Sequence, residues 1–518
     1  MALHTPSKGN STSNLIIPDE VLSIIKKLHG AGHKAYPVGG CVRDALLGIT
    51  PSDWDITTDA KPEEVQKIFP DSFYENAFGT VGVKTESENS TLKVIEITTF
   101  RIEGRYSDAR HPDEIKFAET VEEDLSRRDF TVNAIALGVA ERTAPKTDAN
   151  LRIDANNANK KMLELVDPHH GERDLKAEII RAVGDPEKRF TEDALRLMRA
   201  VRLAAQLGFE IEELTSAAIV KHAGLLEMIA KERIRDEFSK LLMAKDAMRG
   251  IQLLEDLNLL RYVMPELREG IGVGQNLHHI YSVWEHNLRA LDYSAKKNYS
   301  LMVRMASLLH DVGKPRAKRG EGKNSTFYAH DVVGARMTAK ILDRLRYSKN
   351  FIEQVAHLVR HHLFYYNVGE VTAAGVRRFL ARVGPENLDD LFKIREADRI
   401  GSGVPKAVPY KARHLMFMIE KVRRDPVSPR MLALKGDEVM KIASISPSPK
   451  VGFILSLLLE EVLDDPKKNK KEYLATRVTE LAGESDKALA ALAKKAREKK
   501  DEFEAGAEAE MKKQFYVQ

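Results

Sequence analysis

The sequence predicts a multidomain α+β protein with an N-terminal α/β head and a mostly helical remainder. Between residue 17 and about residue 140, short helices alternate with strand-like runs such as KAYPVGG, TVGVKTE and VIEITTF. From about residue 160 onward, apolar residues recur every three to four positions and strand signals nearly vanish. The length of 518 residues also exceeds one ordinary core and favours about three or four domains.

The elements and breaks divide the chain in order. The first helix is expected from Pro18 to Gly30, with apolar residues at helical spacing between them. Stretches rich in Pro and Gly near 265–274 and 401–409 suggest later boundaries. The last segment is rich in Ala, Lys and Glu, and is either a solvated helix or a helix whose basic face lies on an acidic partner. We therefore expect a flexible tail (1–16), the head (17–160), a helical neck (161–270), a third domain (271–420), a helical tail region (421–480) and a charged helical extension (481–518).

Composition indicates a soluble protein of a reducing compartment. The 81 Lys and Arg residues nearly balance the 77 Asp and Glu residues, so the net charge of +4 permits a nucleic-acid partner without demanding one. The single cysteine, Cys41, excludes an intramolecular disulfide and a cysteine-based metal site. No stretch approaches 18 apolar residues, and the polar N-terminus lacks a signal-peptide core. We expect a cytoplasmic protein without membrane contact.

A glycine pair before a helix, in VGGCVRDALLG at 38–48, suggests an anion site. Gly39 and Gly40 let the backbone approach a ligand closely, and the following helix points its N-terminal amides at that ligand. A triphosphate is the natural occupant, with Arg43 as its charged partner. The pair alone is weak evidence, because most such pairs are only turns.

Two nearby carboxylates, Asp53 and Asp55, strengthen this interpretation. In a strand they project from one face, where they repel each other unless a hard cation such as Mg²⁺ lies between them. Glu96 is a candidate third ligand, because Ile95 and Ile97 take the other face of their strand. Such a set suits metal-assisted phosphoryl transfer. The alternatives are a surface turn for the two aspartates and a solvated strand glutamate.

These motifs resemble the signature of the DNA polymerase beta-type nucleotidyltransferases, in the branch that contains bacterial CCA-adding enzymes (tRNA nucleotidyltransferases) and poly(A) polymerases. The resemblance continues in order through 99–117, DLSRRDFTVNAIAL at 124–137, LVDPHHGERDL at 165–175, FTEDALRLMRAVRLAAQLGF at 190–209 and KERIRDEFSKLL at 231–242. It implies a polymerase beta-type head that transfers nucleotides from ATP and CTP to the 3′ end of tRNA with the help of Mg²⁺.

The resemblance also implies roles for residues between head and neck. Polar groups of RRDFTVNA would hold the triphosphate and read the ribose 2′-hydroxyl, although a structural Arg-Asp cluster is the alternative. The segment 99–117 would be a flexible loop, whose presence argues against an enzyme restricted to adding cytosines. The ligand residues would be Arg127, Arg128, Asp129 and Asn133, and the hinge-like motif would contain Asp167, Gly171 and Asp174.

One predicted helix carries a candidate base-selecting element. Cytosine and adenine both present an amine donor beside a ring-nitrogen acceptor, so the carboxylate of Asp193 and the guanidinium of Arg196 would accept these two bases and reject uracil and guanine. The family uses this EDxxR element as a protein template, and Ala194 replaces the family's usual Pro at the helix start. The alternative is structural, because acidic residues three or four positions from an arginine commonly form ion pairs that only stabilise a helix. The residues expected on this helix are Glu192, Asp193, Arg196, Arg199 and Arg202.

The 271–420 region resembles the HD phosphohydrolase superfamily in the order and spacing of VWEHNLRAL, LLHDVGKP, FYAHDVVGARM, VAHLVRHHL and READRIG. The mixed imidazole and carboxylate ligands suit Mn, Ni, Co, Fe or Zn better than Mg alone. A domain with such a site would have phosphatase or 2′,3′-cyclic phosphodiesterase activity. The alternative is a degenerate HD fold that only binds tRNA. The resemblance implies metal ligands at His286, His310, Asp311 and Asp398, with His330 and one of His361 and His362 contacting phosphate or a second metal.

The most economical hypothesis is a template-independent tRNA nucleotidyltransferase that adds C, C and A, with a possible second activity in the HD domain. An A-adding enzyme or a poly(A) polymerase shares the same base-selecting pair. The rivals of other classes are an HD phosphohydrolase with an RNA-binding head and a non-catalytic RNA-binding protein. The sequence does not decide the oligomeric state.

Overall fold

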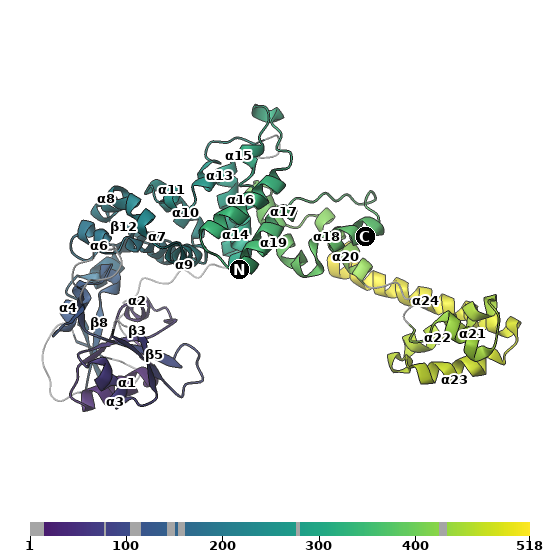
Figure 1. Cartoon of the computed structure of the whole chain (residues 1–518), viewed down its shortest axis with the longest axis horizontal. Coiled ribbons are helices and arrows are strands. Elements are labelled where there is room, and N and C mark those ends of the chain that lie inside the picture. Colours follow the sequence, from purple (N-terminus) through teal and green to yellow (C-terminus); the bar gives the residue numbers. More distant parts are fainter. Residues whose placement is uncertain are drawn as a thin grey trace. The chain divides into compact units, whose positions relative to one another are not determined.

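The computed structural model describes residues 15–76, 79–103, 115–141, 151–153, 161–275, 280–423 and 432–517 (Figure 1). Residues 1–14 of the expected tail and residues 104–114 of the expected loop lie outside the described residues. The chain divides into two compact units: unit 1 holds residues 1–360 and 397–403, and unit 2 holds residues 361–396 and 404–518. The expected class, an α/β head followed by helices, is confirmed. Among the described helices, none has the length and apolar character needed to cross a membrane.

The head is built around a five-stranded mixed sheet in the order β1-β2-β5-β4-β3. Strands β2 and β5 are parallel, and the other neighbours are antiparallel. The sequence of β5 explains its burial, because Ile95 and Ile97 are fully buried while Val94 and Glu96 lie on the exposed face. The strands are β1 (Ala35–Pro37), β2 (Asp55–Thr58), β3 (Ser72–Asn76), β4 (Thr80–Lys84) and β5 (Val94–Thr99).

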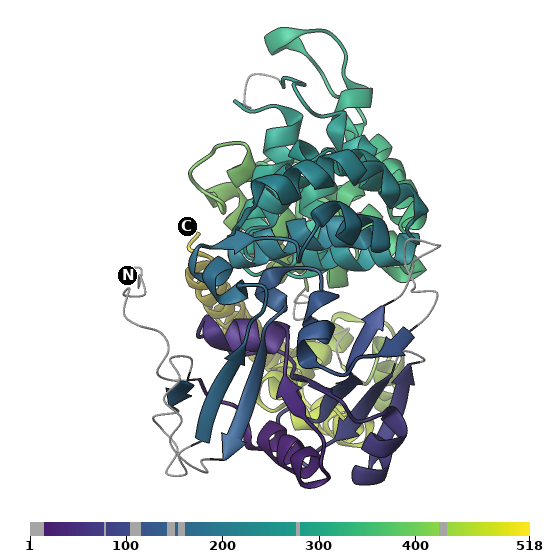
Figure 2. The ribbon, with the colours of Figure 1, turned by 90° about the vertical axis from the view of Figure 1, so that its left-hand side faces the viewer.

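Helices and a second sheet complete the head. Helix α1 (Asp19–Gly30) has the expected bounds and buries Val21, Ile24, Ile25 and Leu28. A three-stranded sheet has the order β8-β10-β9, and its long strands β8 and β10 run side by side in Figure 2. Because β10 runs from Lys161 to Val166, this sheet extends past residue 160, where we placed the end of the head. The other elements are α2 (Gly40–Leu46), α3 (Pro62–Ile68), β6 (Arg101–Glu103), β7 (Ile115–Phe117), α4 (Val121–Ser126), β8 (Ala136–Glu141), β9 (Leu151–Ile153) and α5 (Gly171–Lys176).

The rest of unit 1 is almost entirely helical. Two short strands, β11 (Ile179–Ile180) and β12 (Glu210–Ile211), form a parallel pair beside α7. The helices that follow the head are α6 (Pro186–Glu192), α7 (Leu195–Leu207), α8 (Glu213–His222), α9 (Lys231–Leu242), α10 (Ala247–Asp256), α11 (Leu260–Val263), α12 (Pro265–Arg268), α13 (Val283–Lys296), α14 (Leu301–Leu309), α15 (Lys314–Ala317) and α16 (His330–Arg344). Helices α17 (Lys349–His361) and α19 (Leu388–Gly401) cross the division between the units.

Unit 2 ends in a long helix that packs at both of its ends. Leu489 of this helix belongs to an apolar cluster with residues of α22 and α23, such as Leu458 and Val478. Near its other end, Met511 packs with Phe417 of α20. The charged C-terminal extension is therefore neither wholly solvated nor free of apolar contacts. The helices are α18 (Ala373–Val383), α20 (Tyr410–Arg423), α21 (Gly436–Ala443), α22 (Pro449–Asp464), α23 (Lys471–Ala482) and α24 (Asp486–Phe515).

A tight contact fixes α5 against the short 3-10 turn Thr131–Asn133. Asp167 accepts hydrogen bonds from the amides of Gly171 (2.7 Å) and Glu172 (2.9 Å) at the start of α5. The buried Asp174 accepts a 2.8 Å hydrogen bond from the Thr131 hydroxyl. A Cβ atom on Gly171 would lie 2.1 Å from the Thr131 carbonyl oxygen, so only glycine permits this approach.

We predict that Gly171→Ala destabilises the protein, because backbone atoms rather than a flexible side chain oppose the added methyl group. Overpacking of this kind costs about 3 kcal/mol. The matched control is Gly30→Ala at the end of α1, where an added Cβ would meet nothing within 4 Å. Thermal unfolding of both variants checks the prediction. Equal melting temperatures for Gly171→Ala and the wild type would contradict it.

Candidate functional site

Asp55 and Glu96 lie opposite each other on neighbouring parallel strands. They are register partners at the start of β2 and in the middle of β5. Paired residues point to the same face of a sheet, and Glu96 is exposed while Ile95 and Ile97 are buried on the other face. The structure therefore brings these two carboxylates together on an open face of the head sheet, as their spacing predicts.

Asp53 lies differently from the expectation that both aspartates share one strand. Strand β2 begins at Asp55, and Asp53 is an exposed residue in the bend before it, where Ser52 Oγ donates a 3.1 Å hydrogen bond to its carboxylate. Pro51 and Ser52 favour this turn. In the described part of the chain, the three head carboxylates do not converge within 4.8 Å of one another. Burial raises the pKa of the neighbouring Asp44, and Asp53 adds to this effect while Arg43 opposes it.

The glycine pair and the arginines form one cluster beside this face. Gly39 adopts φ +83°, and a Cβ atom there would lie 2.7 Å from an Nη atom of Arg128. Arg43 donates a 2.6 Å hydrogen bond to the side-chain oxygen of Asn133 and forms a 2.7 Å ion pair with Asp44. A Cβ atom on Gly40 would lie 3.6 Å from Arg43 Nη2. Residues expected around a triphosphate are thus assembled from two separate segments of the chain, 39–43 and 128–133, and include two guanidinium groups.

The buried Asp124 holds Arg127 and also Arg128 of this cluster. Arg127 donates two hydrogen bonds of 2.9 and 2.7 Å to Asp124, and Arg128 donates one of 3.3 Å. Burial favours a raised pKa for Asp124, but the two arginines outweigh it and lower the pKa. Sequence reasoning missed Asp124, although its spacing of three and four residues from the arginines was a signal. Arg127 and Arg128 thus form an ion-paired cluster with Asp124, and the ligand role expected for them stays a prediction.

Asp129 connects the head to helix α7. Its carboxylate accepts a 2.7 Å hydrogen bond from Arg199 Nε and a 2.9 Å hydrogen bond from the Phe130 amide. The amide nitrogen of Asn133 lies 3.4 Å away. Burial alone would raise the pKa of Asp129, but Arg199 and Arg196 outweigh it and lower the pKa to about 2. Asp129 is therefore ionised throughout the physiological range.

The expected base-selecting helix is broken at Asp193. Helix α6 ends at Glu192 and α7 begins at Leu195, so Asp193 lies between two helices rather than on the arginine stripe. Its carboxylate accepts the Leu195 amide (3.0 Å), as a helix cap does. Arg233 of α9 also donates two hydrogen bonds to it, of 3.2 and 2.8 Å. Sequence reasoning missed Arg233, because a partner 40 residues away leaves no local signal.

The three arginines of α7 contact different partners. Arg196, which is 8% exposed, donates hydrogen bonds to Glu192 (2.6 Å) and to the backbone oxygen of Arg127 (3.2 Å). Arg199 binds Asp129, and Arg202 forms a 2.7 Å ion pair with Glu237 of α9. Asp193 and Arg196, the two expected base-selecting residues, are thus each fixed by separate partners.

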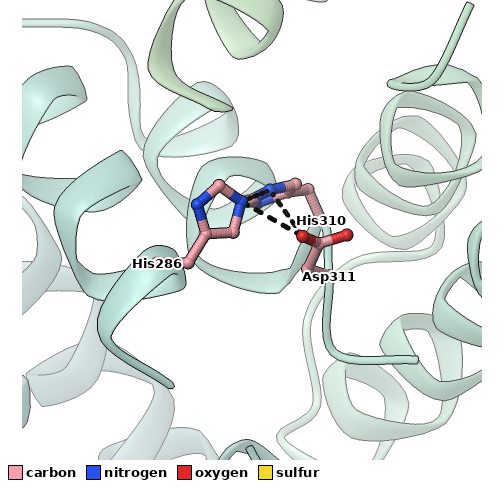
Figure 3. Close-up of side chains that lie close together, drawn as sticks. All are labelled: His286, His310 and Asp311. Atoms are coloured by element: carbon pink, nitrogen blue, oxygen red, sulfur yellow. Dashed lines mark hydrogen bonds and ion pairs between the residues drawn. The ribbon is translucent and has the colours of Figure 1, made fainter. Parts of the chain in front are cut away.

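A second cluster lies among the helices of the 283–400 region (Figure 3). The Nε2 atoms of His286 on α13 and His310 after α14 are 2.8 Å apart. Asp311 Oδ2 lies 3.1 Å from the first and 3.3 Å from the second of these atoms. All three side chains are buried, and Asp398 Oδ1 lies 3.3 Å from His286 Nε2. The four expected metal ligands are therefore together, with their donor atoms pointing at one another.

Two further side chains surround this cluster. Lys314 Nζ lies 2.5 Å from Asp311 Oδ2 and donates a 2.6 Å hydrogen bond to Gln275, and His330 Nε2 lies 3.4 Å from Asp311 Oδ1. Sequence reasoning missed Lys314, although it follows the His-Asp pair in HDVGK. Burial disfavours a charged His310, but Asp311 and Asp398 outweigh burial and raise its pKa to about 10. His361 and His362 belong to unit 2, so their expected role stays a prediction.

The two donor sets suit different ions. Three ligand atoms from His286, His310 and Asp311 lie within 4.8 Å of one another, and two imidazoles with carboxylates fit a transition metal better than Mg²⁺. The head offers only carboxylates, which are the ligands of a hard cation.

Comparisons with known proteins likewise place the two clusters in different domains. The family model of the poly(A) polymerase head domain matches residues 35–181. A second model, described as the probable RNA and SrmB-binding site of polymerase A, matches residues 208–271. The HD domain model matches residues 283–400 and contains all four clustered ligands.

Known relatives match most of the chain. The A-adding tRNA nucleotidyltransferase of Deinococcus radiodurans is 34% identical over 436 residues, covering 82% of this chain and 90% of the relative. The CCA-adding enzyme of Enterococcus faecalis is 30% identical over 483 residues, covering 90% and 97%. Several other CCA-adding enzymes are 39% to 44% identical over alignments that span 55% to 67% of their length. A crystal structure of the Bacillus stearothermophilus CCA-adding enzyme in complex with CTP is 28% identical, with a TM-score of 0.55, and covers 90% of this chain and 98% of that one.

The fold and these relatives define a nucleotidyltransferase with a polymerase-type head and an HD domain. The chain belongs to the tRNA nucleotidyltransferase family, which contains the CCA-adding enzymes and their A-adding relatives.

We predict that Arg199→Met lowers the free energy of unfolding by about 3 kcal/mol, because it leaves Asp129 buried without its main partner. The wild-type Asp129 has a pKa of about 2 against an ordinary value of 3.8, so its contribution is present above pH 4 and is lost as the pH falls toward 2. The cost of Arg199→Met is therefore largest at neutral pH and shrinks below pH 4. Urea unfolding at several pH values measures it.

The matched control is the double variant Asp129→Asn, Arg199→Met, which leaves no buried charge. It should recover part of the lost stability. If both variants unfold at the same urea concentration at neutral pH, the ion pair does not have the structural role assigned to it.

Proposed function

We propose that this protein adds C, C and A in turn to the 3′ end of tRNA, using CTP and ATP and no nucleic-acid template. One observation carries the proposal: the outward carboxylates of Asp55 and Glu96 stand in register beside the cluster of Gly39, Arg43 and Arg128. Carboxylates for a hard cation and guanidinium groups for phosphates are the two components that phosphoryl transfer needs.

Different residues of the head would bind the metal ion and the triphosphate. Asp53, Asp55 and Glu96 would hold Mg²⁺, and Arg43 and Arg128 would bind the triphosphate. A Mg²⁺ ion held there would supply Lewis-acid activation of the attacking 3′-hydroxyl and charge neutralisation of the departing pyrophosphate. Gly39 leaves space for the Arg128 guanidinium, which a side chain at residue 39 would displace. Asn133 orients Arg43 through its side-chain oxygen.

Asp193 and Arg196 would select the base. Both C and A present an amine donor and a ring-nitrogen acceptor, which one carboxylate and one guanidinium match. A mismatched base leaves buried polar groups unpaired, at a cost of about 1–3 kcal/mol each. Arg233 holds Asp193, while Glu192 and the Arg127 carbonyl hold Arg196. A base reader gains selectivity when its groups are fixed before the base arrives, and these supports provide that.

Extension of three tRNA transcripts tests the proposal, with ends before CCA, after C and after CC. We expect Mg²⁺-dependent addition of C, C and A that then stops. Asp55→Ala and Glu96→Ala should reduce the rate by at least about 1,000-fold, because the phosphoryl transfer loses its metal ligands. The control is Glu63→Ala, an exposed carboxylate of α3 outside the sheet face.

The other outcomes assign the activity differently. Extension of the CC end alone identifies an A-adding enzyme, and unlimited addition of A identifies a poly(A) polymerase. Full activity of Asp55→Ala contradicts the metal site in the head.

The buried cluster of His286, His310, Asp311 and Asp398 favours a second candidate function in the same chain. We propose that the HD domain binds a divalent transition-metal ion and hydrolyses phosphate esters such as 2′,3′-cyclic phosphates. The chain supplies two imidazoles and two carboxylates within hydrogen-bonding distance of one another, and Lys314 beside them is placed to bind an anionic substrate.

Full-length Asp55→Ala protein allows this second function to be measured without nucleotide transfer. With Mn²⁺ or Ni²⁺ we expect hydrolysis of 2′,3′-cyclic AMP, and a metal-induced rise in melting temperature that corresponds to about 2.7 kcal/mol at 100 times the dissociation constant. Adding His310→Ala should remove both effects, whereas adding His29→Ala, an exposed histidine of α1, should remove neither. A rise in melting temperature without hydrolysis contradicts the hydrolase and leaves a metal-binding platform.

A further inference from the structure

A row of four register partners crosses the head sheet on its open face. Asp55 on β2 pairs with Glu96 on β5, Glu96 pairs with Gly82 on β4, and Gly82 pairs with Phe73 on the edge strand β3. Because paired residues share a face, Phe73 lies on the same side of the sheet as the two carboxylates. The row thus joins the candidate catalytic carboxylates to an aromatic side chain at the sheet edge.

The ring of Phe73 lies over Gly82 and remains accessible. A Cβ atom on Gly82 would be 2.5 Å from Phe73 Cζ and 2.9 Å from both Cε atoms, so the tip of the ring lies over β4. Phe73 is nevertheless 39% exposed. Cross-strand cover of a glycine by an aromatic ring also stabilises a sheet. An exposed ring next to a pair of carboxylates is in addition a surface on which a flat ligand can stack.

We propose that Phe73 stacks on the base of the 3′-terminal nucleotide of the RNA and so positions the attacking hydroxyl. This inference rests on the proposed nucleotide transfer. The attacking and departing oxygens lie roughly in line, on opposite sides of the phosphorus. The triphosphate cluster around Gly39 and Arg43 follows β1, at one end of the strand order, so the RNA end must enter from the side of β4 and β3.

The dimensions of the sheet agree with this placement. Neighbouring strands are about 4.8 Å apart, which separates the β3 and β5 backbones by about 10 Å. Since the Phe73 ring extends back over β4, about one strand spacing remains between the ring and the Glu96 column. A ribose lying above this strip of the sheet would place its base on the ring and its 3′-hydroxyl near the carboxylates. The exposed Lys84, two residues after Gly82 on the same face, forms a 3.5 Å ion pair with Asp71 and offers a cation to the RNA backbone.

The chemistry of the reaction favours stacking at this place. Each nucleotide added becomes the new 3′ end, so the terminal base changes during the reaction and differs between tRNAs before CCA is added. A pocket that recognised hydrogen-bonding groups would favour one base over the others. Aromatic stacking accepts every base, because every base has a flat face.

Steady-state kinetics of the full-length protein on the three tRNA transcripts tests the inference. Phe73→Ala should raise the KM for RNA about 5- to 100-fold, as expected for loss of one stacked base, with little change in the KM for CTP or ATP. Phe73→Trp should keep wild-type values. The matched control is Tyr74→Ala, the next residue of β3, which is 47% exposed but pairs with the buried Val81 and so faces the other side of the sheet.

Two further measurements separate stacking from the structural role of the ring. Phe73→Leu keeps an apolar cover on Gly82 without an aromatic face, and it should behave as Phe73→Ala does. A transcript without its terminal base should be a poor primer for the wild type, while Phe73→Ala should lose little more on it. Equal RNA kinetics for the wild type, Phe73→Leu and Phe73→Ala overturn the stacking role while nucleotide transfer stands. Absence of extension by the wild type overturns the proposed function and this inference together.

Discussion

The ion pair of Asp129 with Arg199 is the contact on which the join between the head and the following helices depends. A buried carboxylate costs several kcal/mol unless a cation and hydrogen bonds satisfy it, and Asp129 is 8% exposed. Arg199 must therefore stay at the head, and α7 must stay with it. The same helix places Arg196 against the Arg127 carbonyl. The residues proposed to bind the triphosphate and those proposed to select the base are thus fixed relative to one another in one frame.

A second buried arginine continues this frame into the HD domain. Arg304 of α14 is 2% exposed and donates hydrogen bonds to the carbonyl oxygens of Leu242 and Ala244, at the end of α9. Leu242 is the last residue of α9, so the guanidinium satisfies a carbonyl group that a helix end leaves without an intrahelical donor. His310 follows the same helix α14. The metal-ligand cluster is consequently connected to the helix α9 that also supplies Arg233 to Asp193.

Local sequence patterns predicted the helices and strands better than they predicted the tertiary contacts of individual residues. The alternation in β5 placed Glu96 on the open face, and the spacing of apolar residues fixed α1, because each depends only on neighbours in sequence. Two predictions were wrong: that Asp53 lies in a strand and that one helix continues through Asp193. A turn at Pro51 interrupts the first pattern, and the Asp193 carboxylate, which accepts the Leu195 amide, interrupts the second. The pairs Asp193–Arg233 and Phe73–Gly82 depend on tertiary packing and on strand register, which no local pattern contains.

An enzyme that extends RNA without a template has to treat two bases in opposite ways. The incoming base must be chosen, and hydrogen-bonding groups such as Asp193 and Arg196 can choose because a wrong base leaves them unpaired. The terminal base must be tolerated whatever it is, and an aromatic face such as Phe73 tolerates it because stacking ignores the hydrogen-bonding edge. The proposed base-selecting residues lie at the start of α7 and the proposed stacking residue lies on β3, so separate parts of the protein would meet the two requirements. In the proposed function, the carboxylates of Asp55 and Glu96 would then act on any RNA end and on only the chosen nucleotide.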